Sequence, residues 1–312
     1  MIALIRYTGA MKTKKPKPTV RDALHWCTEV LEASDAYFGH GTDNAWDDAV
    51  QLVFHALDLP LDAPEEVLGK PLSAMGEDRL AVLLDKRAAG KVPVPYLTGK
   101  AWFADLEFLC DDRALIPRSP MAELILDGFR PWYAGAGPRR ILDVCCGGGC
   151  IGLAAAHYFP EASVDLLDID PRALALARDN AAYLDLQTRV SIMQSDLFSA
   201  LGQERYDVIL SSPPYVDSAD LAAMPAEYSH EPALGLASGQ DGLDAARRIL
   251  AGAAAYLKQD GVLFVEVGNS SVALEQAFPD VPFTWLEFER GGHGVFTLTA
   301  PELQEYSAYF VR

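Results

Sequence analysis

An apolar segment that runs into a glycine-rich turn, at residues 141–152, limits the fold of this 312-residue chain more than any other feature. The segment Ile141–Val144 has the length and composition of a buried strand, and Gly147, Gly149 and Gly152 follow it. This spacing satisfies the G-x-G-x-x-G pattern, in which glycines let the backbone approach a ligand at the N-terminus of a helix. The pattern alone is weak evidence of binding, because glycine-rich turns also occur where no ligand binds.

Strand-like and helix-like segments alternate after this turn, which predicts an α/β fold with a mostly parallel sheet and helices on both faces. The helical segments include Pro171–Tyr183 and Leu243–Leu257. Only residues 290–294 separate the last two strand candidates, so we expect an antiparallel hairpin at the sheet edge. The seven expected strands are Ile141–Val144, Val164–Asp168, Val190–Gln194, Val208–Ser211, Val262–Val267, Thr284–Phe288 and Val295–Leu298.

The first 120 residues follow a different pattern. Residues 1–18 contain lysines and prolines and little apolar periodicity, which predicts a disordered extension. Apolar residues then recur at helical spacing over 19–92, which predicts a small helical domain whose second helix buries Trp46. Residues 93–120 combine short strand-like segments with prolines, and we interpret them as a hairpin linker to a larger domain at 121–312.

The composition narrows the class of protein. No apolar run approaches the roughly 18 residues needed to cross a bilayer, so we expect a cytoplasmic protein with no membrane contact. The net charge of −18 argues against nucleic acid as the main partner; it either attracts a basic protein or only maintains solubility. Five cysteines form no disulfide framework, and the three at 145–150 lack a nearby histidine or fourth cysteine at ligand spacing, so no metal is expected.

Three successive expected strand ends carry groups suited to a nucleoside. The first is the turn at 145–149, and the second is Asp168, where an acid accepts hydrogen bonds from ribose hydroxyls. At the third, Asp196 can accept from an adenine amino group and Leu197 can pack on the ring. Each acid alone could equally cap a helix or a loop, but ligands sit at the carboxyl ends of such strands. A dinucleotide-dependent oxidoreductase fits these observations equally well.

The fourth expected strand separates the two interpretations, because it ends in Ser212-Pro213-Pro214-Tyr215. A conjugated amino group is a poor nucleophile, and acceptors on its N–H bonds orient it and stabilise the positive charge that grows as a methyl group transfers. The Ser212 hydroxyl and a proline carbonyl can supply these acceptors, the prolines stiffen the backbone, and Tyr215 offers a flat face. The alternative interpretation is a stiff loop without chemical function.

At this point the chain resembles the class I amino-methyltransferases, which combine a turn like Asp143–Gly149 with an [Asn/Asp/Ser]-Pro-Pro-[Tyr/Phe/Trp] segment. That group includes DNA amino-methyltransferases and protein glutamine N5-methyltransferases, and its serine form is familiar among enzymes that methylate cytosine. Five further segments resemble the glutamine methyltransferase branch that modifies the large-subunit ribosomal protein L-three, and the resemblance covers about residues 19–300. These segments are 38–44 (Phe-Gly-His-Gly-Thr-Asp-Asn), 95–98, 101–103, 116–120 (Ile-Pro-Arg-Ser-Pro) and 230–243.

The resemblance implies a seven-stranded, Rossmann-like class I methyltransferase sheet and a helical domain that helps to present the substrate. It implies S-adenosylmethionine as the methyl donor, S-adenosylhomocysteine as the product, and a glutamine of a basic ribosomal protein, free or on assembling ribosomes, as the acceptor. The implied cofactor-binding residues are Asp143, Cys145, Cys146, Gly147, Gly148, Gly149, Asp168, Asp196 and Leu197. The implied substrate-binding residues are Ser212, Pro213, Pro214 and Tyr215, of which Ser212, Pro213 and Tyr215 are catalytic, with Arg118 and Glu231 in support. Arg118 and Glu231 could equally form an interdomain ion pair.

Ser212 is a departure from the family, which has asparagine at this position. Asparagine can accept a hydrogen bond from the substrate amine and donate one to the substrate carbonyl, whereas serine has one rotatable hydroxyl. A lost hydrogen bond in a buried site costs about 1–3 kcal/mol, which corresponds to a roughly five- to hundredfold loss of rate. Two alternatives follow: a DNA amino-methyltransferase, which requires a basic cleft, and a module that binds cofactor without transferring methyl.

Overall fold

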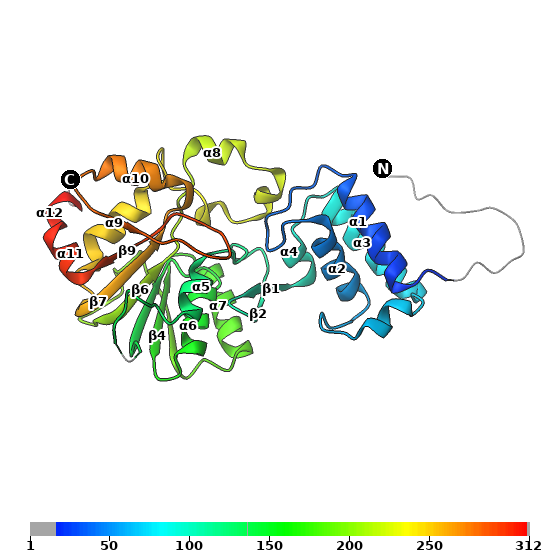
Figure 1. Ribbon diagram of the computed structural model, residues 1–312, viewed down its shortest axis with the longest axis horizontal. Coiled ribbons are helices and arrows are strands. Elements are labelled where there is room, and N and C mark those ends of the chain that lie inside the picture. The colour runs from blue at the N-terminus through cyan, green and yellow to red at the C-terminus, as the bar shows by residue number, and fades with distance from the viewer. Residues whose placement is uncertain (1–16, 136, 311–312) are drawn as a thin grey trace, which may run out of the picture.

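The computed structural model describes residues 17–135 and 137–310. Helices α1–α4 lie at one end of the elongated molecule and the large sheet lies at the other (Figure 1). Residues 1–16 of the expected disordered extension lie outside the described residues. None of the helices among the described residues is long and apolar enough to cross a membrane, and no metal-binding cluster of His, Cys, Asp and Glu occurs there.

Four helices and one 3₁₀ turn form the N-terminal region. Their bounds are α1 (Val20–Glu32), α2 (Ala45–Ala56), η1 (Glu65–Gly69), α3 (Ala74–Ala88) and α4 (Val94–Thr98). Side chains of Thr19, Asn44 and Ser73 cap the first turns of α1, α2 and α3. The expectation that Trp46 is buried is wrong, since its side chain is 42% exposed. The core side of α2 consists of smaller residues such as Ala49, and the Trp46 ring lies at its margin, with its centroid 5.7 Å from that of His25.

The linker contains the expected hairpin, formed by β1 (Lys100–Phe103) and β2 (Leu106–Leu109). Its two turn residues, Ala104 and Asp105, have φ angles of 47° and 59°, as a tight two-residue hairpin turn requires. Asn180 ties the hairpin to the glycine-rich turn. Its Oδ1 accepts from the Leu109 N–H at 2.7 Å, and its Nδ2 donates to the Gly148 carbonyl at 3.0 Å.

The large sheet has seven strands in the order β5-β4-β3-β6-β7-β9-β8, which confirms the predicted α/β class. Strands β3 to β7 are parallel, and β9 is antiparallel to both β7 and β8. The bounds are β3 (Arg140–Val144), β4 (Ser163–Asp168), β5 (Val190–Gln194), β6 (Tyr206–Ser211), β7 (Leu257–Glu266), β8 (Thr284–Trp285) and β9 (Val295–Thr299). The strand order reverses between β3 and β6. Ligands of open α/β sheets bind outside the carboxyl ends of the strands at such a point.

Several expected boundaries differ from the structure, and two of the differences have a clear physical reason. The hairpin at the sheet edge is present, but β8 is only two residues long rather than five. The N–H groups of Glu289 and Arg290 donate to the Glu123 carboxylate at 2.8 and 3.0 Å, which holds the chain away from the sheet edge. The helix expected to reach Leu257 ends at Ala253, because Leu257 already pairs with Tyr206 as the first residue of β7.

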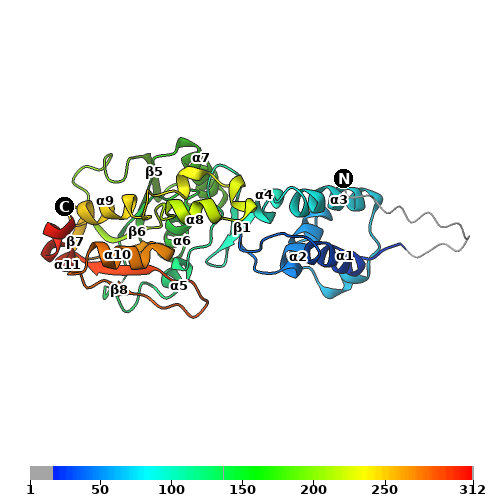
Figure 2. The ribbon, with the colours of Figure 1, turned by 90° about the horizontal axis from the view of Figure 1, so that it is seen from above.

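Helices cover both faces of the sheet (Figure 2). On one face, α5 (Met121–Leu126), α6 (Cys150–Tyr158) and α7 (Pro171–Tyr183) contribute to one apolar cluster. On the other face, the helices that contribute to a second cluster are α9 (Asp244–Ala253), α10 (Ser271–Ala277), α11 (Ala300–Glu305) and α12 (Ser307–Phe310). Between β6 and α9 the chain forms α8 (Ser218–Ala223), η2 (Ala226–His230) and η3 (Ala233–Gly235), and η4 (Gly268–Ser270) follows β7.

Candidate active site

A cavity of about 540 Å³ opens at the carboxyl ends of β3 to β7. It brings together most of the residues that the sequence singled out, which come from the strand ends and from the linker. Those on its wall are Arg118, Cys145, Cys146, Gly147, Gly148, Asp168, Asp196, Leu197, Ser212, Pro213, Pro214 and Tyr215. Asp143, Gly149 and Glu231 do not line it. Any contribution of these three residues to the site therefore acts through their neighbours.

The turn after β3 presents backbone to the cavity. Gly147 has a φ of +54°, a conformation that glycine adopts without strain, and its N–H donates to Asp168 Oδ2 at 2.8 Å. Asp168 Oδ1 accepts from the Asp170 N–H at 2.9 Å, so the carboxylate joins the ends of β3 and β4. Burial raises the pKa of Asp168 above its ordinary value, although these backbone N–H groups oppose the rise. Each of its oxygens retains a lone pair that can accept from a ligand hydroxyl.

Asp143 lies behind the turn and is completely buried. Its Oδ2 accepts from the Gly152 N–H at 2.8 Å, and its Oδ1 has no hydrogen-bond partner among the described residues. Burial raises the pKa of Asp143 to about 8. The contact with Gly152 fixes the first turn of α6, while Gly149 is the N-cap residue that precedes this helix. Asp143 and Gly149 therefore shape the turn without lining the cavity.

The end of β5 forms a more exposed part of the wall. Asp196 is an exposed residue that pairs with Arg248 at 2.8 Å, and this hydrogen bond lowers the pKa of the carboxyl. Arg248 itself lines the cavity and was not expected from the sequence. Leu197 has a φ of +50° and packs against the second apolar cluster, so its backbone turns sharply beside Asp196.

The segment after β6 is held from several sides. The hydroxyl of Ser211 donates to the Val144 carbonyl at 2.7 Å, which fixes the end of β6 against the end of β3. The Tyr215 carbonyl accepts from Ser270 Oγ at 2.8 Å. A Cβ atom at Gly268, where φ is +47°, would lie 2.7 Å from the Tyr215 ring, so only glycine fits there without a shift. Tyr215 is therefore confined to one position on the cavity wall.

Glu266, at the end of β7, is a cavity residue that the sequence interpretation missed. Only 5% of it is exposed, and its carboxylate accepts from Ser119 Oγ at 2.6 Å and from Tyr215 Oη at 3.1 Å. Burial raises the pKa of Glu266, while hydrogen bonds from Ser119, Ser212 and Tyr215 and the charge of Arg118 oppose the rise. The missed signal was an acid directly after the apolar run Val262–Val265, at the carboxyl end of the strand that pairs with β6.

Glu231 connects three segments that lie far apart in the sequence. Its carboxylate accepts from Arg118 Nη1 at 2.9 and 3.0 Å and from the Ile116 N–H at 3.1 Å, and its Oε1 lies 3.0 Å from His40 Nε2. Burial acts to raise the pKa of Glu231, but His40 and Arg118 outweigh it and the pKa lies below its ordinary value. The ion pair that the sequence allowed is therefore present, with Arg118 on the cavity wall and Glu231 behind it. Residues 38–44, 116–120 and 230–243, three of the segments that carried the resemblance, meet here.

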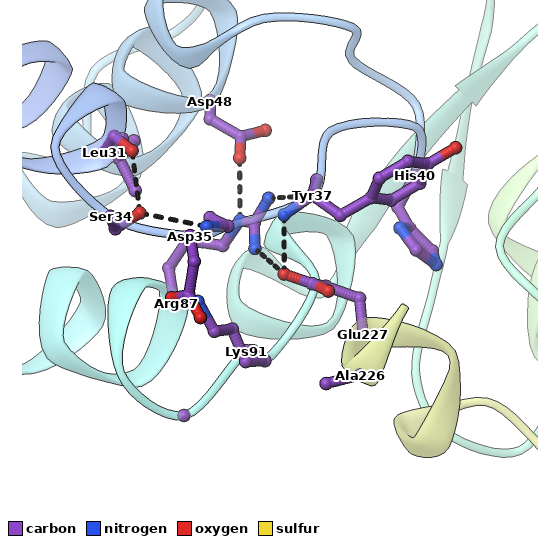
Figure 3. A network of polar contacts seen from close by, with 12 residues as sticks. Leu31, Ser34, Asp35, Tyr37, His40, Asp48, Arg87, Lys91, Ala226 and Glu227 are labelled. Carbon is purple, nitrogen blue, oxygen red and sulfur yellow. Dashed lines mark hydrogen bonds and ion pairs between the residues drawn. The ribbon is translucent and has the colours of Figure 1, made fainter. Parts of the chain in front are cut away.

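A second buried network joins the helical region to the same part of the chain (Figure 3). Arg87 Nε donates to Asp48 at 2.7 Å, Nη1 donates to Glu227 at 3.2 Å, and Nη2 donates to the Tyr37 carbonyl at 2.6 Å. The Tyr37 N–H donates to Glu227 at 2.8 Å. None of Arg87, Asp48 and Glu227 was expected from the sequence, because nothing in the spacing of three charged residues indicates that they are buried together.

The cavity suits a nucleoside and a methionine-like chain better than a metal. The turn offers backbone groups and no bulky side chains, Asp168 offers acceptors for ribose hydroxyls, and Leu197 and Ile169 offer apolar surface. The cavity cysteines are unsuited to act as thiolates, since burial raises the pKa of Cys145 and Cys146. The residues present therefore fit S-adenosylmethionine.

Comparisons with known proteins identify the family. The ribosomal protein uL3 glutamine methyltransferase of Francisella tularensis subsp. tularensis is 44% identical over 293 residues, which cover 94% of this chain and 93% of that protein. The enzyme of the same name from Xanthomonas campestris pv. campestris is 45% identical over 290 residues, covering 93% of this chain and 94% of that protein. The chain belongs to the uL3 glutamine methyltransferase family. The predicted family, in which uL3 is the ribosomal protein called L-three above, is thereby confirmed.

Two further comparisons match part of the chain. The family model described as the methyltransferase small domain matches residues 130–227. A solved methyltransferase from Pyrococcus furiosus is 18% identical with a TM-score of 0.47, over 72% of this chain and 98% of that one. The predictions that the chain is a methyltransferase and uses S-adenosylmethionine are confirmed with the family, and the relatives give no support to a DNA amino-methyltransferase.

Proposed function

We propose that this chain transfers a methyl group from S-adenosylmethionine to the side-chain amide nitrogen of a glutamine in ribosomal protein uL3. The observation that carries the proposal is the placement of Ser212–Tyr215 on the wall of the same cavity as the turn 145–149 and Asp168. A methyl donor held by the turn and an amide held by the segment after β6 would meet inside one cavity. Two proteins named for this activity are 44% and 45% identical to the chain over nearly its full length, which supports the choice of substrate.

The strand ends β3, β4 and β5 form the cofactor half. S-adenosylmethionine, when bound, supplies an electrophilic methyl group on a positively charged sulfur. The backbone at Cys145–Gly148 would contact its methionine part, Asp168 would accept from its ribose hydroxyls, and Asp196 and Leu197 would contact its adenine. Asp143 would contribute by holding the turn through Gly152.

The segment Ser212–Tyr215 forms the substrate half. The Ser212 hydroxyl and the Pro213 carbonyl would accept the two N–H bonds of the glutamine amide and turn its nitrogen towards the methyl group. Pro214 limits the freedom of the backbone that carries these acceptors. The Tyr215 ring, wedged against Gly268, provides a fixed surface for the planar amide.

Glu266 would act on the charge that develops during transfer. As the carbon–sulfur bond breaks and the carbon–nitrogen bond forms, the nitrogen becomes positively charged and then loses one of its protons. Glu266 is buried on this side of the cavity, and no ion-pair partner contacts it in the described residues 17–135 and 137–310. Its negative charge would therefore stabilise the cationic nitrogen, and its carboxylate would accept the released proton.

The substrate protein is expected to be basic, and the chain's net charge of −18 would attract it. We place the reaction in the cytoplasm, on uL3 that is either free or part of an assembling ribosome. No direct binding of DNA is expected, since the acidic surface would repel its phosphates.

The test is to incubate the chain with S-adenosylmethionine and uL3 from the same species and to locate the methyl group by tandem mass spectrometry. We expect one additional methyl group on a glutamine side chain. A matched control is Asp168→Ala, which should lose methylation and S-adenosylhomocysteine binding together, because each lost ribose contact weakens binding. Methylation of duplex DNA with none on uL3 would contradict the proposal and favour the alternative.

A further inference from the structure

The chain between β6 and α9 forms one side of the cavity and is supported from the helical region. We call residues 224–236 of this connection the wall loop. The wall loop contains η2 and η3, and it lines the cavity with Met224, Tyr228 and Leu236 among others. Its two buried acids, Glu227 and Glu231, do not line the cavity, and both contact the helical region. The position of this wall therefore depends on residues outside the sheet.

Glu227 is the first of the two contacts (Figure 3). It is 2% exposed, and its Oε1 accepts from the Tyr37 N–H at 2.8 Å and from Arg87 Nη1 at 3.2 Å. Arg87 is equally buried and also donates to Asp48 and to the Tyr37 carbonyl. Arg87 and Glu227, which lie 140 residues apart in the sequence, thus hold both polar groups of the Tyr37 backbone.

His40 is the second contact, and it belongs to the segment 38–44 that the chemistry at the cavity does not use. Its ring centroid lies 4.5 Å from that of Tyr228, and its Nε2 lies 3.0 Å from Glu231 Oε1. Thr42 of the same segment donates its hydroxyl to Asp48, the partner of Arg87. The segment therefore connects the two contacts and supports Tyr228 from behind.

Tyr228 and Arg118 are the cavity residues that these contacts hold. The Arg118 guanidinium lies 5.3 Å from the centre of the Tyr228 ring and pairs with Glu231. Both residues affect the pKa of Tyr215. Burial and the charge of Glu266 raise this pKa, Arg118 opposes the rise, and Tyr228 adds to it. Both residues line the cavity together with Tyr215, which belongs to the half that we assign to the glutamine.

We propose that Glu227 is a positioning residue for the protein substrate, which fixes the wall loop against Arg87 and Tyr37 and so places Tyr228 and Arg118 around the incoming glutamine. The proposal rests on the proposed function for the identity of the substrate. The helical region then completes the substrate half of the cavity, in addition to any contact of its outer surface with uL3. Loss of the Glu227 contact should impair use of the protein substrate and leave cofactor binding intact, because the cofactor half consists of strand ends.

The test compares Glu227→Leu and Glu227→Gln with Asp58→Asn as the matched control. Asp58 is an exposed acid of the helical region that pairs with Arg79, so Asp58→Asn removes one negative charge from the protein, as the Glu227 variants do. Arg87 keeps Asp48 as a partner in both Glu227 variants, so no arginine is left without a counter-ion. The measurements are KM and kcat for uL3, S-adenosylhomocysteine affinity, and amide hydrogen exchange over residues 34–44 and 224–236.

We expect Glu227→Leu to raise the KM for uL3 about tenfold or more, with S-adenosylhomocysteine affinity within about twofold of the unchanged chain. Hydrogen exchange should accelerate in both segments, since Tyr37 loses the acceptor of its N–H. Glu227→Gln retains an acceptor oxygen and should give a smaller rise, and Asp58→Asn should give none. If Glu227→Leu does not fold, the graded KM and exchange effects of Glu227→Gln against Asp58→Asn decide the matter.

Unchanged KM and unchanged exchange in the folded Glu227 variants would overturn the inference, as would a parallel loss of S-adenosylhomocysteine affinity. Failure of the proposed function has a different signature. The unchanged chain would then not methylate uL3 at all, whereas the exchange measurement would still report whether Glu227 holds the wall loop.

Discussion

The two halves of the cavity are built in different ways. The half that we assign to the cofactor comes from β3, β4 and β5, whose ends lie side by side because the strands are neighbours in one parallel sheet. The half that we assign to the glutamine combines the end of β6 with Glu266, the linker and the wall loop, and the wall loop is held by Arg87 and His40 of the helical region.

This difference indicates which residues determine cofactor binding and which determine the use of the protein substrate. The cofactor half uses short-range geometry, such as the Gly147 N–H on Asp168, that any chain with this turn can form. The substrate half depends on buried charges from distant segments, which are costly to bury and so require matched partners. Changes to the cofactor half should therefore alter cofactor binding, and changes to the substrate half should alter methyl transfer and KM for uL3 while cofactor binding persists.

The largest effect is expected from Glu266→Gln, which tests whether Glu266 belongs to the substrate half of the cavity. We expect kcat to fall by about a hundredfold to a thousandfold, in the range seen when one group that stabilises transition-state charge is removed. S-adenosylhomocysteine affinity should stay nearly unchanged, because the hydrogen bonds of Glu266 within the described part of the chain come from Ser119 and Tyr215 rather than from the turn. The measurement is single-turnover methylation of uL3 alongside equilibrium binding of S-adenosylhomocysteine.

The pH dependence tests the same residue. Burial raises the pKa of Glu266, and the active form is the carboxylate, so kcat of the unchanged chain should fall as pH decreases through that raised value. Ser119→Ala removes one donor to the carboxylate, so it should raise the pKa further and move this fall to higher pH. A pH profile of Glu266→Gln that keeps the same acidic fall would contradict the assignment.

Ser212→Asn should have a smaller effect on glutamine methylation than Glu266→Gln, and in the opposite direction. Asparagine can accept from the amide N–H and donate to the amide carbonyl, so we expect glutamine methylation to be unchanged or to rise by up to roughly a hundredfold. The measurement is kcat/KM for uL3, with S-adenosylhomocysteine affinity as the control. Lost methylation with intact cofactor binding would show that Ser212 does not hold the glutamine.

The sequence predicted the fold and the cavity residues at the ends of β3 to β5 better than the residues that support the other side of the cavity, for a physical reason. Buried parallel strands and the turn 145–149 leave local patterns, namely apolar runs of fixed length and glycines at fixed spacing. Edge elements leave weaker patterns, and β8 is shorter than expected because Glu123 binds the backbone that follows it. Trp46 was misplaced because periodicity locates a helix face only approximately, and a large ring at its margin can stay exposed.

The substrate half could be predicted only where it coincides with a contiguous motif. Ser212–Tyr215 forms such a motif, and it lies on the cavity wall. Glu227 and Arg87 are 140 residues apart, and each is a charged residue whose ordinary place is the surface. Their burial follows from how the helical region packs on the wall loop, which no local spacing encodes. His40 stood out only as part of a resemblance, without a role.

Arg248→Ala is the smallest change and tests the outer rim of the cofactor half. Arg248 lines the cavity and pairs with Asp196, but both side chains are about half exposed, and exposed ion pairs contribute little. We expect S-adenosylhomocysteine affinity to fall by less than about threefold and the KM for uL3 to stay unchanged. Isothermal titration at low and high salt measures this, since the small effect should shrink as salt screens the pair. A large loss of affinity would mean that Arg248 contacts the cofactor directly, and the cofactor half would then extend beyond the strand ends to α9.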